Sequence, residues 1–424
     1  MIKILDYNAL GEKIFERQEQ KTNVDKIVAE IIQKVKTEGD KALFDYALKF
    51  DKATLNSLEV SKEEFDEALT LVEPEFIKIL EKASNNIKTF HSKQVRQGFK
   101  IEEKDGAIVG QKITAVERAG LYVPGGTAAY PSTVLMDSIP AKIAGVKEVC
   151  ITTPPNAQGK INPVILVAAK IAGVDKVYKV GGAQAIAALA YGTETIKPVD
   201  KIVGPGNAFV AEAKRQVYGK VSIDMIAGPS EILVIADKKS NPKHVAADLL
   251  SQAEHDKMAS AVLVTDSLDL ARSVANEIEI QLEKLERKDI ARTSIDENGK
   301  IIVAKDLEEV VSVSNKIAPE HLELMVDNPF DYLEKITNAG SVFMGRYTPE
   351  ALGDYFAGPN HTLPTSGTAK FSSPLSVDDF IKKTQYVYYT KEALEKVYKD
   401  VEYFANKEGL QAHAKSATVR FEKE

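Results

Sequence analysis

The chain has 424 residues, a length for about three domains, and its 55 basic and 62 acidic side chains give a formal net charge of −7. This mild acidity argues against a nucleic-acid-binding protein, which usually presents a basic face. Apolar residues form 44% of the chain, enough for a large core, but no stretch approaches the about 20 apolar residues that span a bilayer. The sequence lacks a secretory signal pattern and has a single cysteine, Cys150. We therefore expect a cytoplasmic protein with no disulfide framework, no cysteine-rich zinc site, and no nucleic-acid or membrane partner.

The first hundred residues indicate helices. Apolar residues recur at helical spacing in residues 24–47 and again in residues 63–90. Glycine and proline are scarce there, so we expect few tight turns.

Residues 112–237 have a different character, because short β-branched runs alternate with helix-like segments. A valine-containing strand pattern that ends in a Gly/Pro turn occurs in residues 144–155, 172–182 and 199–207. Strand and helix alternation with right-handed crossovers predicts a parallel sheet. Such sheets bind ligands at the carboxyl ends of their strands, where these turns lie.

A second alternating stretch follows. Its pattern predicts strands at residues 232–236, 261–265, 301–304 and 341–344, and helices at residues 242–254 and 268–285. The tail from Ser376 is charged and is expected to be helical. The predicted fold class is α/β, with two Rossmann-like parallel-sheet αβα domains, a helical N-terminal segment and a helical C-terminal appendage.

Four glycine turns follow strand-like runs, at residues 123–126, 181–184, 204–207 and 227–230. Glycine lets a ligand approach the backbone, and the N–H groups at a helix start suit anions, so a nucleotide site is one interpretation. The other is that glycine and proline simply end strands. None of the turns matches the dinucleotide fingerprint, because Phe209 occupies the place of its third small residue, and no Walker A sequence occurs.

Two of the six histidines, His91 and His244, lie in polar helical stretches and are expected at the surface. Gln252 and His255 are three residues apart, so a helix would present both on one face, where they could reach one metal ion. Glutamine is an unusual ligand, and an interpretation without a metal stays open.

Three further segments combine histidine with an acidic residue. Glu320 and His321 could both approach one cavity as general bases if they lie in an extended segment, although a plain turn is the alternative. His361 lies in a Gly/Pro/Asn-rich loop seven residues after Asp354, which favours a role in loop chemistry over core packing. The last histidine belongs to a charged helix and by itself indicates a surface position. Together these side chains offer donors suited to zinc, although the HExxH and CxxC motifs are absent.

Eight segments carry a specific resemblance. Residues 223–231 read IDMIAGPSE and residues 248–255 read DLLSQAEH. The others are GLYVPGG, VGGAQAIAALAYGTE, KIVGPGNAFVAEAKRQV, APEHLEL, GDYFAGPNHTLPTSGTA and EGLQAHAKS. Over essentially the whole chain, these segments resemble the histidinol dehydrogenase family.

This resemblance implies a zinc-dependent, NAD-linked enzyme of the last steps of histidine biosynthesis. The reaction would oxidise L-histidinol through L-histidinaldehyde to L-histidine and reduce two NAD. The resemblance also implies a homodimer in which Glu408 and His413 of one subunit reach into the active site of the other.

Matched position by position, the resemblance implies roles for single residues. Glu320 and His321 would be the catalytic acid/base pair. The zinc ligands would be Gln252, His255, Asp354 and His413. The NAD site would include Tyr122, Gln184 and Asn207. The substrate would contact Ser230, Gln252, His255, Glu320, His321, Asp354, His361, Glu408 and His413.

The expected domain boundaries follow the same resemblance. Residues 1–16 would form the N-terminal helical segment, and residues 17–121 with 231–374 a discontinuous first αβα domain. Residues 122–230 would form the second αβα domain. Residues 375–424 would form the appendage that contacts the partner subunit.

The mechanism expected from these roles needs no cysteine. Cys150 lies in the strand-like segment VKEVCITT and is expected to be buried, so the second oxidation should pass through an aldehyde hydrate rather than a thiohemiacetal. Zinc would fix the pose of the substrate, His321 would remove the hydroxyl proton, and Glu320 would activate water.

Three alternatives stay open at this point. A relative could oxidise another polar alcohol to its acid with the same zinc and NAD. A zinc hydrolase could use Glu320 without a dinucleotide. A scaffold protein could keep the fold without catalysis. The set Ser230, His361 and Glu408 favours histidinol, and the intact Glu320–His321 pair argues against a scaffold.

Overall fold

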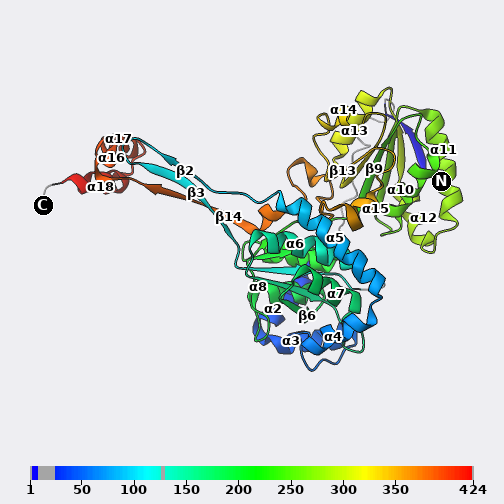
Figure 1. The fold of residues 1–424 in the computed structure, drawn as a ribbon, viewed down its shortest axis with the longest axis horizontal. Helices are drawn as coiled ribbons and strands as arrows, with labels where there is room; N and C mark the ends of the chain where they lie inside the picture. Colours follow the sequence, from blue (N-terminus) through cyan, green and yellow to red (C-terminus); the bar gives the residue numbers. More distant parts are fainter. Residues whose placement is uncertain (1, 8–23, 126–128, 423–424) are drawn as a thin grey trace. The chain divides into compact units, whose positions relative to one another are not determined.

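The computed structural model describes residues 2–7, 24–125 and 129–422 (Figure 1). Contacts divide the chain into two compact units. The main unit comprises Met1–Gln94 and Val116–Phe380, and the small unit comprises Val95–Ala115 and Ile381–Glu424. Among the described residues, no helix is long and apolar enough to cross a membrane.

The main unit contains a six-stranded sheet in which every neighbouring pair is parallel. Its strands, in spatial order, are β1 (Lys3–Asp6), β11 (Lys300–Val303), β10 (Ser260–Thr265), β9 (Glu231–Ala236), β12 (His321–Met325) and β13 (Ser341–Met344). The order reverses between β9 and β12, as in a Rossmann-like sheet, with β1 added at one edge.

Helices cover both faces of this sheet (Figure 1). They are α10 (Pro242–Ala253), α11 (Leu268–Leu282), α12 (Lys288–Glu297), α13 (Leu307–Ile317) and α14 (Phe330–Leu333). Successive side chains of β9 point to opposite faces: Ile232 and Val234 pack with α10 and α11, whereas Leu233 and Ile235 pack with α13. A central strand buried on both faces explains the continuous apolar run of β9 in the sequence.

A second parallel sheet of the main unit has five strands with the same kind of order. Its strands are β6 (Lys176–Lys179), β5 (Glu148–Thr153), β4 (Arg118–Tyr122), β7 (Lys201–Val203) and β8 (Ser222–Ile223), and its helices are α6 (Pro131–Ala144), α7 (Pro163–Ala172), α8 (Gly182–Tyr191) and α9 (Ala208–Val217). The prediction of two Rossmann-like parallel sheets is confirmed.

The helices expected in the first hundred residues are present. They are α2 (Asp25–Glu38), α3 (Asp40–Tyr46), the π-helix η2 (Ala47–Asp51), α4 (Lys62–Leu71) and α5 (Pro74–Ser92). The apolar stripe of α2 packs against α8, so this helix belongs with the five-stranded sheet. We had expected residues 17–121 to join residues 231–374. The domain boundaries stay a prediction. Any division of the main unit into domains should keep α2 together with α8.

The N-terminal segment differs from the expected helix. Residues 3–6 form β1, which pairs in parallel with β11, and Ile2 is buried beside it. The remainder of that expected helical segment, residues 8–16, lies outside the described residues. Four residues are too few to show a periodicity, and the pairing partner lies about 300 residues further along the chain.

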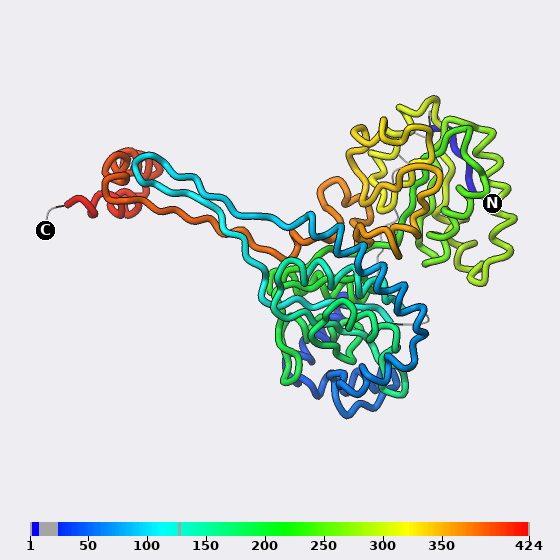
Figure 2. The backbone as a smooth tube through the Cα atoms, in the orientation of Figure 1, coloured from blue at the N-terminus to red at the C-terminus, as the bar shows by residue number. Residues whose placement is uncertain are grey.

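The small unit contains an antiparallel three-stranded sheet that the sequence pattern did not reveal. Its strands, in spatial order, are β14 (Ile381–Tyr388), β3 (Ile108–Ala115) and β2 (Phe99–Glu102). Figure 2 shows the stretch of chain that carries β2 and β3 side by side with the stretch that carries β14. The helices of the tail follow as α16 (Lys391–Glu395), α17 (Tyr398–Lys407) and α18 (Gln411–Thr418). The expected helical appendage is therefore correct only after residue 390. Since β14 is exposed along nearly its whole length, its sequence shows no apolar alternation.

Candidate active site

A cluster of buried acid and base side chains lies at the amino-terminal ends of β9 and β12. His321 is the first residue of β12, Glu320 directly precedes it, and Ser230 directly precedes β9. These two strands flank the point where the strand order reverses. Ligands of parallel sheets usually bind at the carboxyl ends of the strands, which is the position that the sequence predicts for residues 112–237. In this sheet the candidate residues lie at the opposite end.

His321 is the centre of this cluster. Its Nδ1 donates to the carbonyl oxygen of Glu231 at 3.0 Å and lies 2.9 Å from Nε2 of Gln252. Its Nε2 lies 3.5 Å from Oδ1 of Asp354 and 3.9 Å from Oε1 of Glu350. Carboxylates around the buried imidazole, Glu320 first among them, outweigh the effect of burial and raise the pKa of His321 to about 10.

Asp354 belongs to the π-helix η3 (Gly353–Ala357), which continues the short helix α15 (Glu350–Leu352). Burial opposes its ionisation, but the close approach of His321 Nε2 and the charges of His321 and His361 lower the pKa of Asp354 to about 2. Together, His321, Glu350 and Asp354 offer one nitrogen and two oxygen donors that lie within 4.8 Å of one another. This donor set is compatible with zinc and with other divalent ions.

Glu320 is buried, and its Oε2 accepts the backbone N–H of Glu231 at 2.9 Å. The same oxygen lies 3.6 Å from Nδ1 of His321. Burial raises the pKa of Glu320 to about 7, although the positive charge of His321 opposes this shift. A carboxyl group with this pKa can exchange protons near neutral pH, as a general acid/base must.

Gln252 and His255 come from the end of α10, as their spacing predicted. Gln252 is buried beside His321, whereas His255 follows the last turn and is exposed. Partial burial of its ring lowers the pKa of His255, and the Asp354 carboxylate opposes that shift, so the two side chains lie close enough to interact electrostatically.

His361 approaches the cluster from a loop. Its Nδ1 donates to the backbone carbonyl of Asp354 at 3.1 Å, and its Nε2 accepts from the Thr133 hydroxyl on α6 at 3.2 Å. Burial lowers its pKa. Ser230 is half-buried next to Glu231. The main unit thus brings seven of the nine residues expected to contact substrate into one neighbourhood.

The other two expected residues, Glu408 and His413, belong to the small unit. Glu408 follows α17 and His413 lies in α18, and both are exposed there. Their contribution to an active site stays a prediction.

A cavity of about 900 Å³ lies at the carboxyl ends of the five-stranded sheet. Its lining includes Tyr122, Gln184 and Asn207, the three residues expected to bind NAD. The Tyr122 hydroxyl accepts the N–H of Gly182 at 3.1 Å, and Asn207 caps α9 by accepting the N–H of Phe209. Helix α8 begins at Gly182 with no side-chain cap, so N–H groups of its first turn remain available to an anion.

Two of the glycine turns at this cavity are required by packing. A Cβ at Gly125 would lie 2.2 Å from Cγ of Pro154, and a Cβ at Gly181 would lie 2.6 Å from Cβ of the same proline. At both glycines the backbone therefore packs closely against Pro154, which itself lines the cavity.

The family description of histidinol dehydrogenase matches residues 15–421. A histidinol dehydrogenase of Clostridium acetobutylicum is 56% identical over 427 residues, covering 99% of this chain and 99% of that protein. One of Streptococcus mutans is 55% identical and covers 98% and 97%. The chain belongs to the histidinol dehydrogenase family.

A solved structure agrees with this membership. The crystal structure of histidinol dehydrogenase from Elizabethkingia anophelis matches with a TM-score of 0.95 at 42% identity, covering 99% of this chain and 98% of that chain. The resemblance seen in the sequence is confirmed, and so is the α/β fold class. As a histidinol dehydrogenase family member, the chain is an oxidoreductase.

Sequence reasoning missed two parts of the candidate site. Glu350 is buried beside His321, where burial and the charge of Asp354 raise its pKa. Its spacing of four residues from Asp354 is the sequence signal that could have identified it. Phe50 and Asp51 line the cavity of the five-stranded sheet from the end of the π-helix η2. Their stretch showed only a helical pattern, and π-helices are frequent at functional sites.

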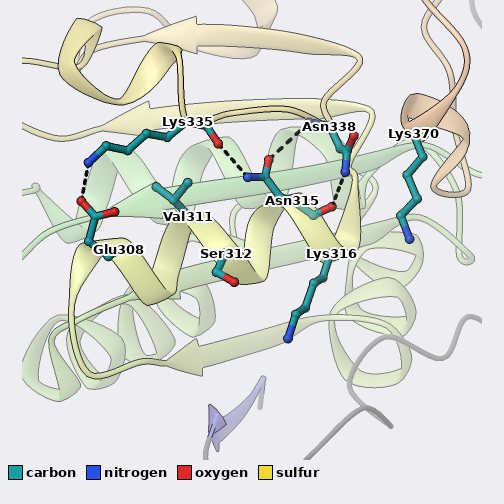
Figure 3. A pocket seen from close by; sticks show the side chains of 8 residues that line it. All are labelled: Glu308, Val311, Ser312, Asn315, Lys316, Lys335, Asn338 and Lys370. Atoms are coloured by element: carbon teal, nitrogen blue, oxygen red, sulfur yellow. Dashed lines mark hydrogen bonds and ion pairs between the residues drawn. The ribbon is translucent and has the colours of Figure 1, made fainter.

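A shallow hollow of about 500 Å³ beside α13 has a different character (Figure 3). Lys335 pairs with Glu308, and the Asn315 amide donates to the Lys335 carbonyl at 2.7 Å. The Asn338 amide in turn donates to the Asn315 carbonyl at 3.0 Å. These polar groups bond one another, so we assign no chemistry to this hollow.

Proposed function

We propose that this histidinol dehydrogenase family member oxidises L-histidinol through L-histidinaldehyde to L-histidine and reduces two NAD. It would act in the cytoplasm, in the last steps of histidine biosynthesis. The observation that carries the proposal is the buried Glu320–His321 pair beside Asp354, in a chain that also has a dinucleotide-sized cavity. A hydrolase would not need that cavity.

The donor set supports a zinc site. His321 Nε2 is buried, and among the described residues it has no hydrogen-bond partner, although two carboxylates face it. A cluster with this excess of negative charge favours a cation. We propose Gln252, His255, Asp354 and the partner subunit's His413 as the zinc ligands. Zinc, when bound, would orient the imidazole and amino nitrogens of the substrate and, by offsetting the carboxylate charge, lower the pKa of His321 toward that of a general base.

Two proton acceptors serve the two oxidations. In the first, His321 accepts the hydroxyl proton while the carbinol hydride leaves for NAD. In the second, Glu320 accepts a proton from the water that adds to the aldehyde, and His321 accepts a proton from the resulting diol as the second hydride leaves. The raised pKa of Glu320, about 7, makes this carboxyl a stronger base than an ordinary glutamate.

The remaining residues would bind and orient. We propose that Ser230, His361 and the partner subunit's Glu408 contact the substrate along with the ligand residues. Tyr122, Gln184 and Asn207 would hold NAD in the cavity of the five-stranded sheet, with its phosphates near the uncapped start of α8.

A homodimer would explain the surface of the small unit. Large apolar side chains are exposed on it, among them Phe99 at 55%, Val387 at 70% and Phe404 at 67%. Exposed apolar side chains in such number are typical of an interface.

The first experiment measures NADH formed from L-histidinol, with zinc present and after chelation. Two NADH per histidine, lost on chelation and restored by zinc, are expected. Glu308→Gln, which changes an exposed carboxylate of the main unit, is the matched control and should behave as wild type. No NADH from zinc-loaded, folded protein would overturn the substrate. NADH from another amino alcohol would indicate a relative with a different substrate, and none from any alcohol would favour the hydrolase.

A further inference from the structure

Two residues of α10 face two residues of β12. Asp248 and Gln252 lie one helical turn apart on α10, and His321 and Glu323 lie two residues apart on β12, on one face of the strand. Gln252 lies 2.9 Å from His321, and the carboxyl of Asp248 interacts electrostatically with that of Glu323. The first pair belongs to the candidate active site. Asp248 and Glu323, the second pair, have not been given a role in that site.

Glu323 is fully buried, with 0% of its surface exposed. Its Oε1 accepts the backbone N–H of Glu350 at 2.7 Å. Its Oε2 has no hydrogen-bond partner within the described part of the chain. Burial and the neighbouring Asp248 carboxylate raise the pKa of Glu323 to about 9. Burial of the Glu323 carboxyl next to a half-buried Asp248 carboxyl is unfavourable for folding, so this pair costs stability rather than adding to it.

The hydrogen bond to Glu350 links this pair to the active site. Glu350 is the first residue of α15, and α15 continues directly into η3, which carries Asp354. The Ser251 hydroxyl of α10 also approaches the Glu350 carboxyl, at 3.3 Å. Glu323 therefore lies where α10, β12 and α15 meet. These elements carry Gln252, His321 and, through η3, Asp354.

We propose that Glu323, with Asp248, is a positioning residue: it anchors the first amide of α15 and so sets where Asp354 and Glu350 stand relative to His321. Glu323 touches neither the substrate nor the proposed metal, and it acts through the α15–η3 segment. This inference rests on the proposed function, because the geometry it maintains is that of the proposed zinc site.

Two substitutions at one position test it. Glu323→Gln keeps an oxygen that accepts from Glu350 and a polar group that interacts with Asp248, whereas Glu323→Leu removes the hydrogen bond and the polar group. Partners that orient metal ligands typically change metal affinity or activity about 10- to 100-fold when they are lost, so the leucine variant should bind zinc at least about 10-fold more weakly. Its kcat should fall as well, while its KM for NAD stays unchanged. The glutamine variant should restore most of the zinc affinity.

Zinc affinity is measured by competition with a chromophoric chelator, which needs no turnover. Leu324→Ala is the matched control, because Leu324 is the next residue of β12 and packs into the core of the opposite face. It should lower Tm without changing zinc affinity. If Glu323→Leu does not fold, Asp248→Ala at the half-buried end of the pair should weaken zinc binding, and Asp248→Asn should restore it.

The outcomes separate the two proposals. Folded Glu323→Leu or Asp248→Ala with wild-type zinc affinity and kcat would overturn the positioning role. A weaker zinc affinity that Leu324→Ala reproduces would also overturn it, because general destabilisation would then be the cause. Wild-type protein that binds no zinc would overturn the proposed function itself.

Discussion

Glu320 and His321 are neighbours in the chain and yet have different surroundings. Glu320 is buried against the backbone of Glu231, and burial raises the pKa of its carboxyl to about 7. His321 is buried among carboxylates, which raise the pKa of its imidazole. Two proton carriers with separate environments suit a reaction that has two proton-transfer stages.

The role of Glu320 predicts a selective defect. Glu320→Gln should convert supplied L-histidinaldehyde to histidine about 10²- to 10⁴-fold more slowly, since a general base is lost, while oxidation of the alcohol suffers less. In wild type the aldehyde step should slow as pH falls through about 7, because the Glu320 carboxyl becomes protonated. Stopped-flow NADH formation from the aldehyde measures both effects. A glutamine variant with a wild-type aldehyde rate would contradict the assignment.

In contrast to Glu320, Cys150 should be dispensable for catalysis. The thiol is fully buried in β5, and burial raises its pKa to about 12, so it is not a nucleophile at neutral pH. Cys150→Ala should keep kcat for histidinol within about a factor of two of wild type. Its Tm should fall slightly because a buried sulfur is removed. Steady-state NADH formation and thermal unfolding check this, and an inactive but folded variant would restore the thiohemiacetal route.

At the scale of elements, the loop that carries His361 is held by a helix of the other sheet. The Asn360 amide donates to the Met136 carbonyl at 2.6 Å, and the Thr362 hydroxyl donates to Asp137 at 2.8 Å. His361 itself bonds to Thr133 of the same helix, α6. The orientation of a proposed substrate contact therefore depends on α6 as well as on its own loop.

Asp137 makes the contact between α6 and the loop that carries His361 sensitive to pH. Burial raises its pKa to about 8 from an ordinary value of 3.8, so the folded protein keeps a proton that the unfolded chain loses. Folded-state stability must then fall as pH rises between these two values. Asp137→Asn carries no such charge, so its Tm should improve relative to wild type as pH rises from 5 to about 8. Thermal unfolding of both proteins across this range measures the difference. A difference that does not change with pH would contradict the prediction.

The whole molecule is proposed to work as a dimer in which each active site combines two chains. Most proposed site residues belong to the main unit, whereas Glu408 and His413 are exposed on the small unit. A three-stranded antiparallel sheet with apolar side chains in solvent is a structure that gains stability from a partner.

Mixing two inactive variants tests this arrangement. Glu320→Gln and His413→Asn should each fail to form histidine from histidinol as pure dimers. If His413 acts in the partner's site, a mixed dimer has one site with both native residues, so random reassociation should recover about a quarter of wild-type activity. If both residues act within one chain, every site keeps one defect and no activity returns. Activity after co-refolding, compared with each variant refolded alone, decides between the two.

The sequence by itself determined the type of most elements and the identity of the family. Apolar periodicity located α2, α5, α10 and most strands of the two parallel sheets, although not β1 or β12, because those elements bury whole faces and their residues repeat at local spacing. The family motifs in the sequence also identified Glu320, His321 and Asp354, which the structure brings together.

Other features were decided only by the tertiary structure. Pairing of β3 with β14 joins residues about 270 positions apart, and β14 is too exposed to show a pattern. The location of the site at the amino ends of β9 and β12, and the burial of Glu323 and Glu350, likewise depend on which elements pack together. A glutamate in a sequence carries no sign of burial, because its surroundings come from residues distant in the chain.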